Sequence, residues 1–161
     1  MTRPSSTKPP RKESPGWVFF TDRDLGKALP NALRKAGYMV VIHDDHFLDT
    51  RTRDEVWLPE VAKRGWIALS HNKGIRRVSE ERDAAMRGGL ALFFLIGKRH
   101  EELIANVVAT APGIIRFREK HAPPFIAHVT RPHSKFAVGS RPGDVKMVLT
   151  KEQWERLRGG G

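Results

Sequence analysis

The fold is decided by the stretch FFTDRDLGKALPNALRKAGYMVVIHDDHF, residues 19–47. The apolar run Trp17–Thr21 at its start predicts a buried strand. Apolar residues then recur at helical spacing until Gly37, which is expected to end the helix. A second apolar run, Tyr38–His43, predicts another buried strand. Two such strands joined by a helix are typical of a parallel sheet that is covered on both faces.

The alternation of strands and helices continues beyond this stretch. Thr52 and Glu55 form a capping-box pattern for a helical stretch that reaches Arg64, with Pro59 as a division point. Three further strands are predicted at Trp66–Ser70, Leu90–Ile96 and Phe125–Thr130, and two further helices at Ser79–Arg87 and Glu101–Lys120, the latter with a break at Pro112. We therefore expect an α/β fold, a three-layer α/β/α sandwich with a mainly parallel, roughly five-stranded sheet.

The two ends of the chain differ from this central part. Residues 1–16 are rich in Pro, Ser and basic residues, so we expect a disordered basic arm before a domain at residues 17–132. In residues 133–161, the runs Lys135–Val138 and Val145–Leu149 flank a turn and predict a hairpin. Thr150 and Gln153 then predict the cap of a short helix, followed by a flexible end.

Composition narrows the class of partner. The formal net charge is +11, and the basic residues recur along the whole chain, which favours RNA or another polyanion as a partner. No apolar run is long enough to span a membrane. The chain has no cysteine, which excludes thiolate metal sites and suits a reducing cytoplasm.

Acidic side chains crowd one edge of the predicted sheet. In a parallel sheet, ligands bind beyond the carboxyl ends of the strands. The residues that follow the first three strands, or open the helix after the second, include Asp22, Asp24, Asp44, Asp45, Asp54 and Asn72. Clustered carboxylates repel one another unless a divalent cation neutralises them, so this edge predicts a site for Mg²⁺ or Mn²⁺. Each acid taken alone could instead cap a helix or close a turn.

These motifs, FFTDRDLGKALPNALRKAGYMVVIHDDHF and then TRDEVWLPEVAKRGWIALSHNKGIRR, resemble the PIN-like domains grouped with VapC-type toxins. The resemblance covers roughly Trp17 to Pro132. It implies a Mg²⁺-dependent endoribonuclease of a toxin–antitoxin system, held inactive by a cognate antitoxin protein, and it suggests a homodimer.

The resemblance also assigns roles to residues. Asp22 matches the metal-binding aspartate after the first strand, and Asp54 matches the acid at the start of the helix after the second. Asn72 stands where the family's Thr-x-Asp-Lys-like motif has a third aspartate. An amide oxygen can bind a cation but brings no negative charge, so activity is expected to be weakened or lost. Asn72 is either an inactivating substitution or natural divergence.

Other residues near this edge have weaker assignments. Lys73, Arg76 and Arg77 could bind RNA phosphates or form a solvated basic loop. His43, His46 and His71 could assist proton transfer, although most isolated histidines do not.

Two other function classes compete with RNA cleavage. A catalytically dead PIN-like domain could bind RNA or a protein partner. A receiver-like signalling domain would need an aspartate at the end of the third strand, where Ser70, His71 and Asn72 stand instead. A phosphate-binding glycine loop is not found after the first strand.

Overall fold

The computed structural model describes residues 16–22, 25–43, 54–71, 75–97, 100–132, 137 and 139–159. Only the backbone is described for residues 54–58, 75–81, 100 and 158–159. The expected arm, residues 1–16, lies outside these ranges except for Gly16.

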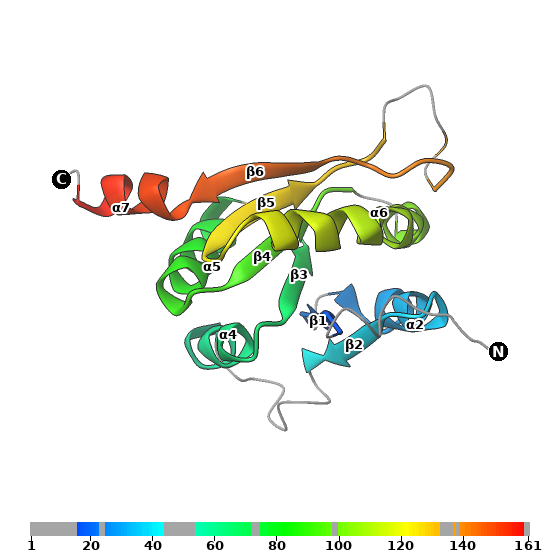
Figure 1. Cartoon of the computed structure of the whole chain (residues 1–161), viewed down its shortest axis with the longest axis horizontal. Helices are drawn as coiled ribbons and strands as arrows, with labels where there is room; N and C mark the ends of the chain where they lie inside the picture. Colours follow the sequence, from blue (N-terminus) through cyan, green and yellow to red (C-terminus); the bar gives the residue numbers. More distant parts are fainter. Residues whose placement is uncertain are drawn as a thin grey trace.

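Strands and helices alternate along the chain, as the apolar pattern predicted (Figure 1). Their order is β1 (Val18–Thr21), α2 (Ala28–Lys35), β2 (Met39–Ile42), α4 (Asp54–Lys63), β3 (Ile67–His71), α5 (Ile75–Gly88), β4 (Ala91–Leu95), α6 (His100–Lys120), β5 (Phe125–Val129), β6 (Val145–Thr150) and α7 (Lys151–Gly159). Each of the five strands predicted between Trp17 and Thr130 lies within one residue of the observed one at each end. Gly37 follows α2 with φ of 100°, a conformation that glycine adopts without strain.

The strands form one sheet in the order β2-β1-β3-β4-β5-β6. The first five are parallel, and β6 runs antiparallel along β5. The α/β fold with a mainly parallel sheet is therefore confirmed, with six strands instead of about five. Val145–Leu149 of the expected hairpin forms β6, which pairs with β5 over its whole length. Residues 135, 136 and 138 of the other run lie outside the described part, so the pairing of the two runs stays a prediction.

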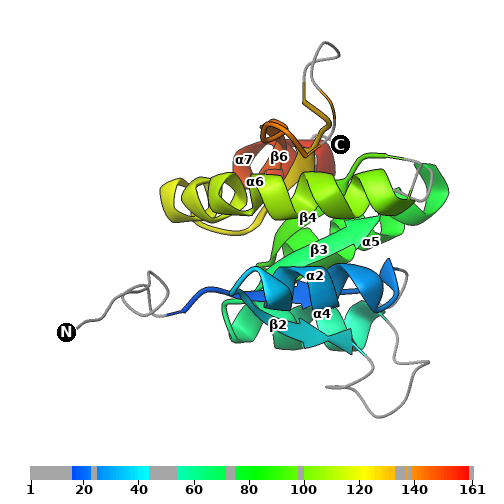
Figure 2. The ribbon, with the colours of Figure 1, turned by 90° about the vertical axis from the view of Figure 1, so that its right-hand side faces the viewer.

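Two groups of buried apolar side chains hold the layers together, one on each face of the sheet. The helices that cover these faces are drawn in Figure 2. On one face, Leu29 of α2 and Val107 of α6 pack against the sheet; we call this the α6 face. On the other, Val61 of α4, Met86 of α5 and Trp154 of α7 pack against the sheet; we call this the α5 face. This arrangement is the expected three-layer sandwich.

Two prolines that were expected to interrupt helices do not. Pro59 lies inside α4 and Pro112 lies inside α6, and both helices continue through them. A proline inside a helix removes one hydrogen bond and costs about 3 kcal/mol. Buried contacts on both sides of Pro112, from Val107, Ala111 and Ile114, offset that cost.

The crossover through α6 has an unusual geometry. The connections β3-α5-β4 and β4-α6-β5 step in the same direction across the sheet, yet α5 and α6 lie on opposite faces. The two connections therefore have opposite hands, whereas nearly all such crossovers share one hand. As a result, α6 packs beside α2 on the α6 face, and the opposite face of β5 is contacted by α5 instead.

Candidate active site at the carboxyl ends of β1 and β3

The strand order changes direction beside β1. From β1 the chain moves to β2 on one side, and it later returns to β3 on the other. Helices that leave β1 and β3 therefore diverge to opposite faces at the carboxyl ends of these strands. Open α/β sheets bind their ligands at such a switch point. The residues just beyond Thr21 and Leu69 are thus the first candidates for a functional site.

Asp22 lies at this point and is held in place. Its backbone N–H donates to the carbonyl oxygen of Leu69 at 3.1 Å. Its carboxylate Oδ2 accepts a hydrogen bond from the Ser70 hydroxyl at 3.2 Å. Asp22 is 5% exposed and Ser70 is fully buried, so the carboxylate has a fixed orientation away from bulk water. Burying a carboxylate is unfavourable unless its charge is compensated.

His43 stands on the other side of Asp22. The register of β1 and β2 ends at the pair Thr21 and Ile42, so Asp22 and His43 are the next residues on neighbouring chains. The His43 ring is fully buried, with its centroid 6.1 Å from that of Phe20. His43, Asp22 and Ser70 thus form a row of buried polar residues at the carboxyl ends of three adjacent strands.

Backbone placement brings the start of α4 to the same edge. This helix runs from the carboxyl edge of the sheet towards the amino end of β3, and it packs on the α5 face. Its first residue is Asp54. The side chain of Asp22 also faces the α5 face, because Asp22 follows Phe20 by two residues and Phe20 packs there. Asp22 and the start of α4 therefore share one edge and one face.

The helix α5 begins at this edge as well, four residues beyond His71. Arg76 and Arg77 lie in its first turn, where no acidic residue is present. Helix α5 starts earlier than the predicted Ser79, so these two arginines belong to a helix and not to a loop. Their placement beside the carboxyl end of β3 is established, whereas the contacts of their side chains stay predictions.

Several predicted site residues lie outside the described part of the chain: Asp24, Asp44, Asp45, His46, Asn72 and Lys73. The side chain of Asp54 lies outside it too. Within the described ranges, no three His, Asp or Glu side chains lie close enough to hold a metal ion. The convergence of Asp22, Asp54 and Asn72 on one ion therefore stays a prediction.

His71 points away from Asp22. It follows Leu69 by two residues and so lies on the α6 face, opposite to Ser70. Its Nε2 is 3.0 Å from the carbonyl oxygen of Gly97, which follows β4. This contact ties the ends of β3 and β4 together, a structural role that fits the position better than proton transfer at Asp22.

Ser70 is the residue that the sequence analysis missed as a participant. From the sequence alone, Ser70 served only as an argument against a receiver-like domain, which would need an aspartate at the end of this strand. The alternation of side chains along β3 could have found it, because Ser70 is the one polar residue that follows Ala68 on the α5 face and adjoins Asp22 in register. Thr21, by contrast, is fully buried on the α6 face, and its hydroxyl has no hydrogen-bond partner among the described residues.

Comparison with known protein families gives a match for the first four strands. Residues 18–97, which include β1 to β4, match a family model described as "PIN like domain". No curated protein and no solved structure matches the chain. In the described part of the chain, no helix is both long and apolar enough to cross a membrane. PIN-like domains are commonly nucleases. Residues 18–97 thus match the PIN-like domain family, and the six-stranded, mainly parallel α/β fold is consistent with it.

Proposed function

We propose that the protein is a metal-dependent endoribonuclease of the toxin–antitoxin type whose activity is weakened by Asn72. The observation that supports this most directly is the buried Asp22 carboxylate, which Ser70 orients at the switch point of the sheet. A carboxylate that is held in one orientation at the carboxyl ends of the strands suits a metal-binding role.

The proposed ligands are the carboxylates of Asp22 and Asp54 and the side-chain oxygen of Asn72. Mg²⁺ prefers such hard oxygen donors, few in number, together with water and phosphate oxygens, and Mn²⁺ accepts the same donors. When bound, the ion would activate water and stabilise the leaving oxygen of a phosphodiester. Asp24, Asp44 and Asp45 are additional acids in the same chain segments. In this scheme Ser70 keeps the Asp22 carboxylate in one orientation.

The basic residues of the chain suit an RNA substrate. The net charge is +11, and Lys73, Arg76 and Arg77 follow β3 directly. Each phosphate neutralised by such a side chain releases counterions and strengthens binding. The start of α5 also presents its backbone N–H groups and the positive end of its dipole at this edge.

Further proposals follow from the resemblance to toxin-type PIN-like domains. We expect a cognate antitoxin as protein partner, self-association as a homodimer, and a location in the cytoplasm, where the absence of cysteine is usual.

The first test restores the missing charge. Asn72→Asp should raise Mg²⁺- or Mn²⁺-dependent cleavage of RNA at least about tenfold, since changes even around a metal site alter activity by 10- to 100-fold. Asp22→Asn in that background should abolish it. Cleavage would be followed with end-labelled RNA, with chelator as the blank. Asn31→Asp is the matched control, because it adds the same charge on the exposed side of α2.

The second candidate function is a catalytically dead PIN-like domain that binds RNA or a protein. Asn72 favours it, because a neutral amide replaces one of the expected acids. This candidate would be preferred if Asn72→Asp binds RNA but cleaves none in either metal.

A further inference from the structure

On the α5 face, the described side chains of β5 and β6 are less buried near the carboxyl edge than near the amino edge. Because α6 packs on the other face, it does not cover this area. At the amino edge α7 covers the same face through Trp154, which packs with Leu149 of β6. Near the carboxyl edge His128 is only partly buried, and Lys146 is exposed.

These two residues belong to a row that begins at the candidate site. Ser70 pairs with Phe94, Phe94 with His128, and His128 with Lys146. Paired residues of adjacent strands project from the same face, so the row crosses the α5 face from Ser70 to the edge strand. With about 4.8 Å between strands, the four steps from Asp22 to Lys146 span about 19 Å.

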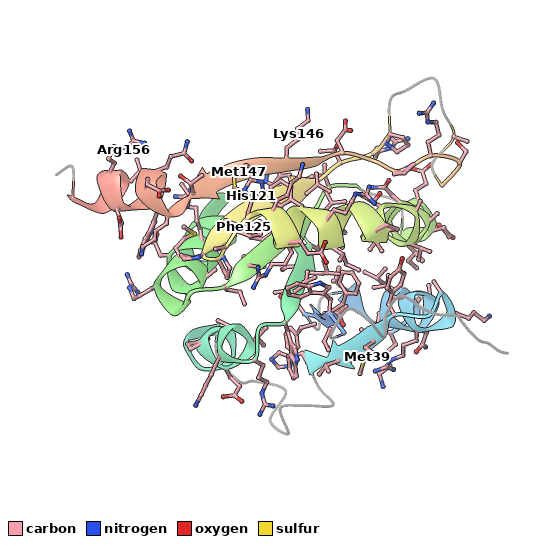
Figure 3. The ribbon with its side chains drawn as sticks, in the orientation of Figure 1. Met39, His121, Phe125, Lys146, Met147 and Arg156 are labelled. Atoms are coloured by element: carbon pink, nitrogen blue, oxygen red, sulfur yellow. The ribbon has the colours of Figure 1, made fainter. Side chains whose placement is uncertain are left out.

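The far end of this row carries an available cation. Lys146 projects from β6 away from the rest of the molecule (Figure 3), and it has no ion pair with any described residue. Some exposed cations are paired, for example Arg64 with Glu60 and Arg131 with Glu102, whereas Lys120 at the end of α6 has no ion pair with a described residue either. Burial lowers the pKa of His128, so its imidazole is neutral at pH 7 and can donate one hydrogen bond.

Basic residues also lie along the carboxyl edge between Asp22 and Lys146. Phe94 is buried, so a ligand cannot follow the row beneath α5. It can pass along the carboxyl edge, around the first turn of α5, where the backbone places Arg76 and Arg77. Cations would then accompany a polyanion from the switch point to the edge strand.

We propose that His128 and Lys146 form a remote phosphate-binding site for the RNA strand whose scissile bond lies at Asp22. This inference rests on the proposed function, and it assigns a substrate-binding role to β5 and β6, which lie beyond the family match. The strand of RNA runs from Asp22 past the start of α5 to Lys146. A protein partner fits this surface less well, because its exposed side chains at the carboxyl edge are polar and an interface core is usually apolar.

The test is equilibrium binding of fluorescent single-stranded RNA of about ten nucleotides, measured in chelator by anisotropy at several salt concentrations. Lys146→Gln should weaken binding several-fold and reduce the slope of log K against log salt by about 0.7, the value for one phosphate contact on a single strand. Lys146→Arg should retain both. Lys120→Gln is the matched control, because it removes the same charge from the exposed end of α6 at the opposite edge of the sheet.

Equal behaviour of Lys146→Gln and Lys120→Gln would overturn the inference and leave the proposed cleavage untouched. If Lys146→Gln alone weakens binding while Asn72→Asp cleaves no RNA, the proposed nuclease activity fails and the remote contact stands. A labelled acidic peptide that loses affinity in Lys146→Gln, with RNA binding unchanged, would assign this surface to a protein and also overturn the inference.

Discussion

Asp22 and Ser70 show how a single side-chain contact prepares a charged group for function. A carboxylate that is removed from water must be stabilised by hydrogen bonds, by a cation, or by both. Ser70 supplies one hydrogen bond at 3.2 Å from a fully buried position on β3. If the remaining compensation comes from a metal ion, the hydroxyl serves to orient a ligand, and its removal should affect function more than folding.

Ser70→Ala tests this role. In the Asn72→Asp background, it should lower metal-dependent cleavage by about 10- to 100-fold, as is typical when a group that orients a metal ligand is lost. The apparent metal affinity, measured by titrating Mn²⁺ against cleavage rate, should weaken as well. Ser70→Thr keeps the hydroxyl and should retain activity.

A purely structural serine would give a different pattern. The thermal unfolding midpoint of Ser70→Ala would then fall while its metal titration stayed unchanged, and Ser70→Thr would not differ from Ser70→Ala in cleavage.

For single residues, the sequence predicted a role that depends on position along the chain. It missed a hydrogen bond between residues that are far apart in the chain. Asp22 could be singled out because it directly follows an apolar strand. The partnership with Ser70 could not, because the two residues are 48 positions apart and meet only through the pairing of β1 with β3.

At the scale of elements, the C-terminal strand β6 and helix α7 both pack against the rest of the fold. Strand β6 extends the sheet beyond β5, with a register irregularity beside Ala127. Helix α7 begins with the capping box that the sequence predicted: Thr150 and Gln153 each donate a backbone N–H to the other's side chain, at 2.9 and 3.1 Å. Trp154 then lies over the α5 face and donates from Nε1 to Asp83 of α5 at 3.2 Å.

Trp154 should therefore link α7 to the core and to α5. Trp154→Ala should cost about 3–5 kcal/mol of unfolding free energy, because it removes a large buried ring. Trp154→Phe keeps most of the ring but loses the donor, and should cost about 1 kcal/mol from the hydrogen bond. Urea unfolding followed by circular dichroism measures both changes.

Asp83→Ala provides the comparison for the hydrogen bond. It should match Trp154→Phe in size, and the double variant should cost less than the sum of the two. Additive losses would contradict a direct link between these side chains.

Errors in the predicted elements have identifiable physical causes. The sequence analysis did not predict that Val145–Leu149 would extend the main sheet beside β5, whose apolar residues lie in the core. Breaks were expected at Pro59 and Pro112 from local geometry alone, but packing on the sheet keeps α4 and α6 continuous. Predictions from local sequence were correct where the burial of apolar side chains favours the same helix or strand.

Across the whole molecule, topology is what gathers the candidate groups. The order β2-β1-β3 puts the end of β1 between two parallel strands, and α4 and α5 both begin at that edge on the face to which Asp22 points. Sequence periodicity gives the number and length of strands but not their order, nor the face on which each helix packs. The opposite hand of the α6 crossover was therefore beyond prediction from the sequence.

The central claim is that Asp22 and Asp54 share one divalent ion, and anomalous diffraction from a crystal soaked in Mn²⁺ tests it most directly. A peak at about 2.0–2.2 Å from the carboxylates of both residues, close to the side-chain oxygen of residue 72, is the predicted result. Failure of the two carboxylates to approach a common position, with no peak at either under saturating Mn²⁺, would contradict the claim.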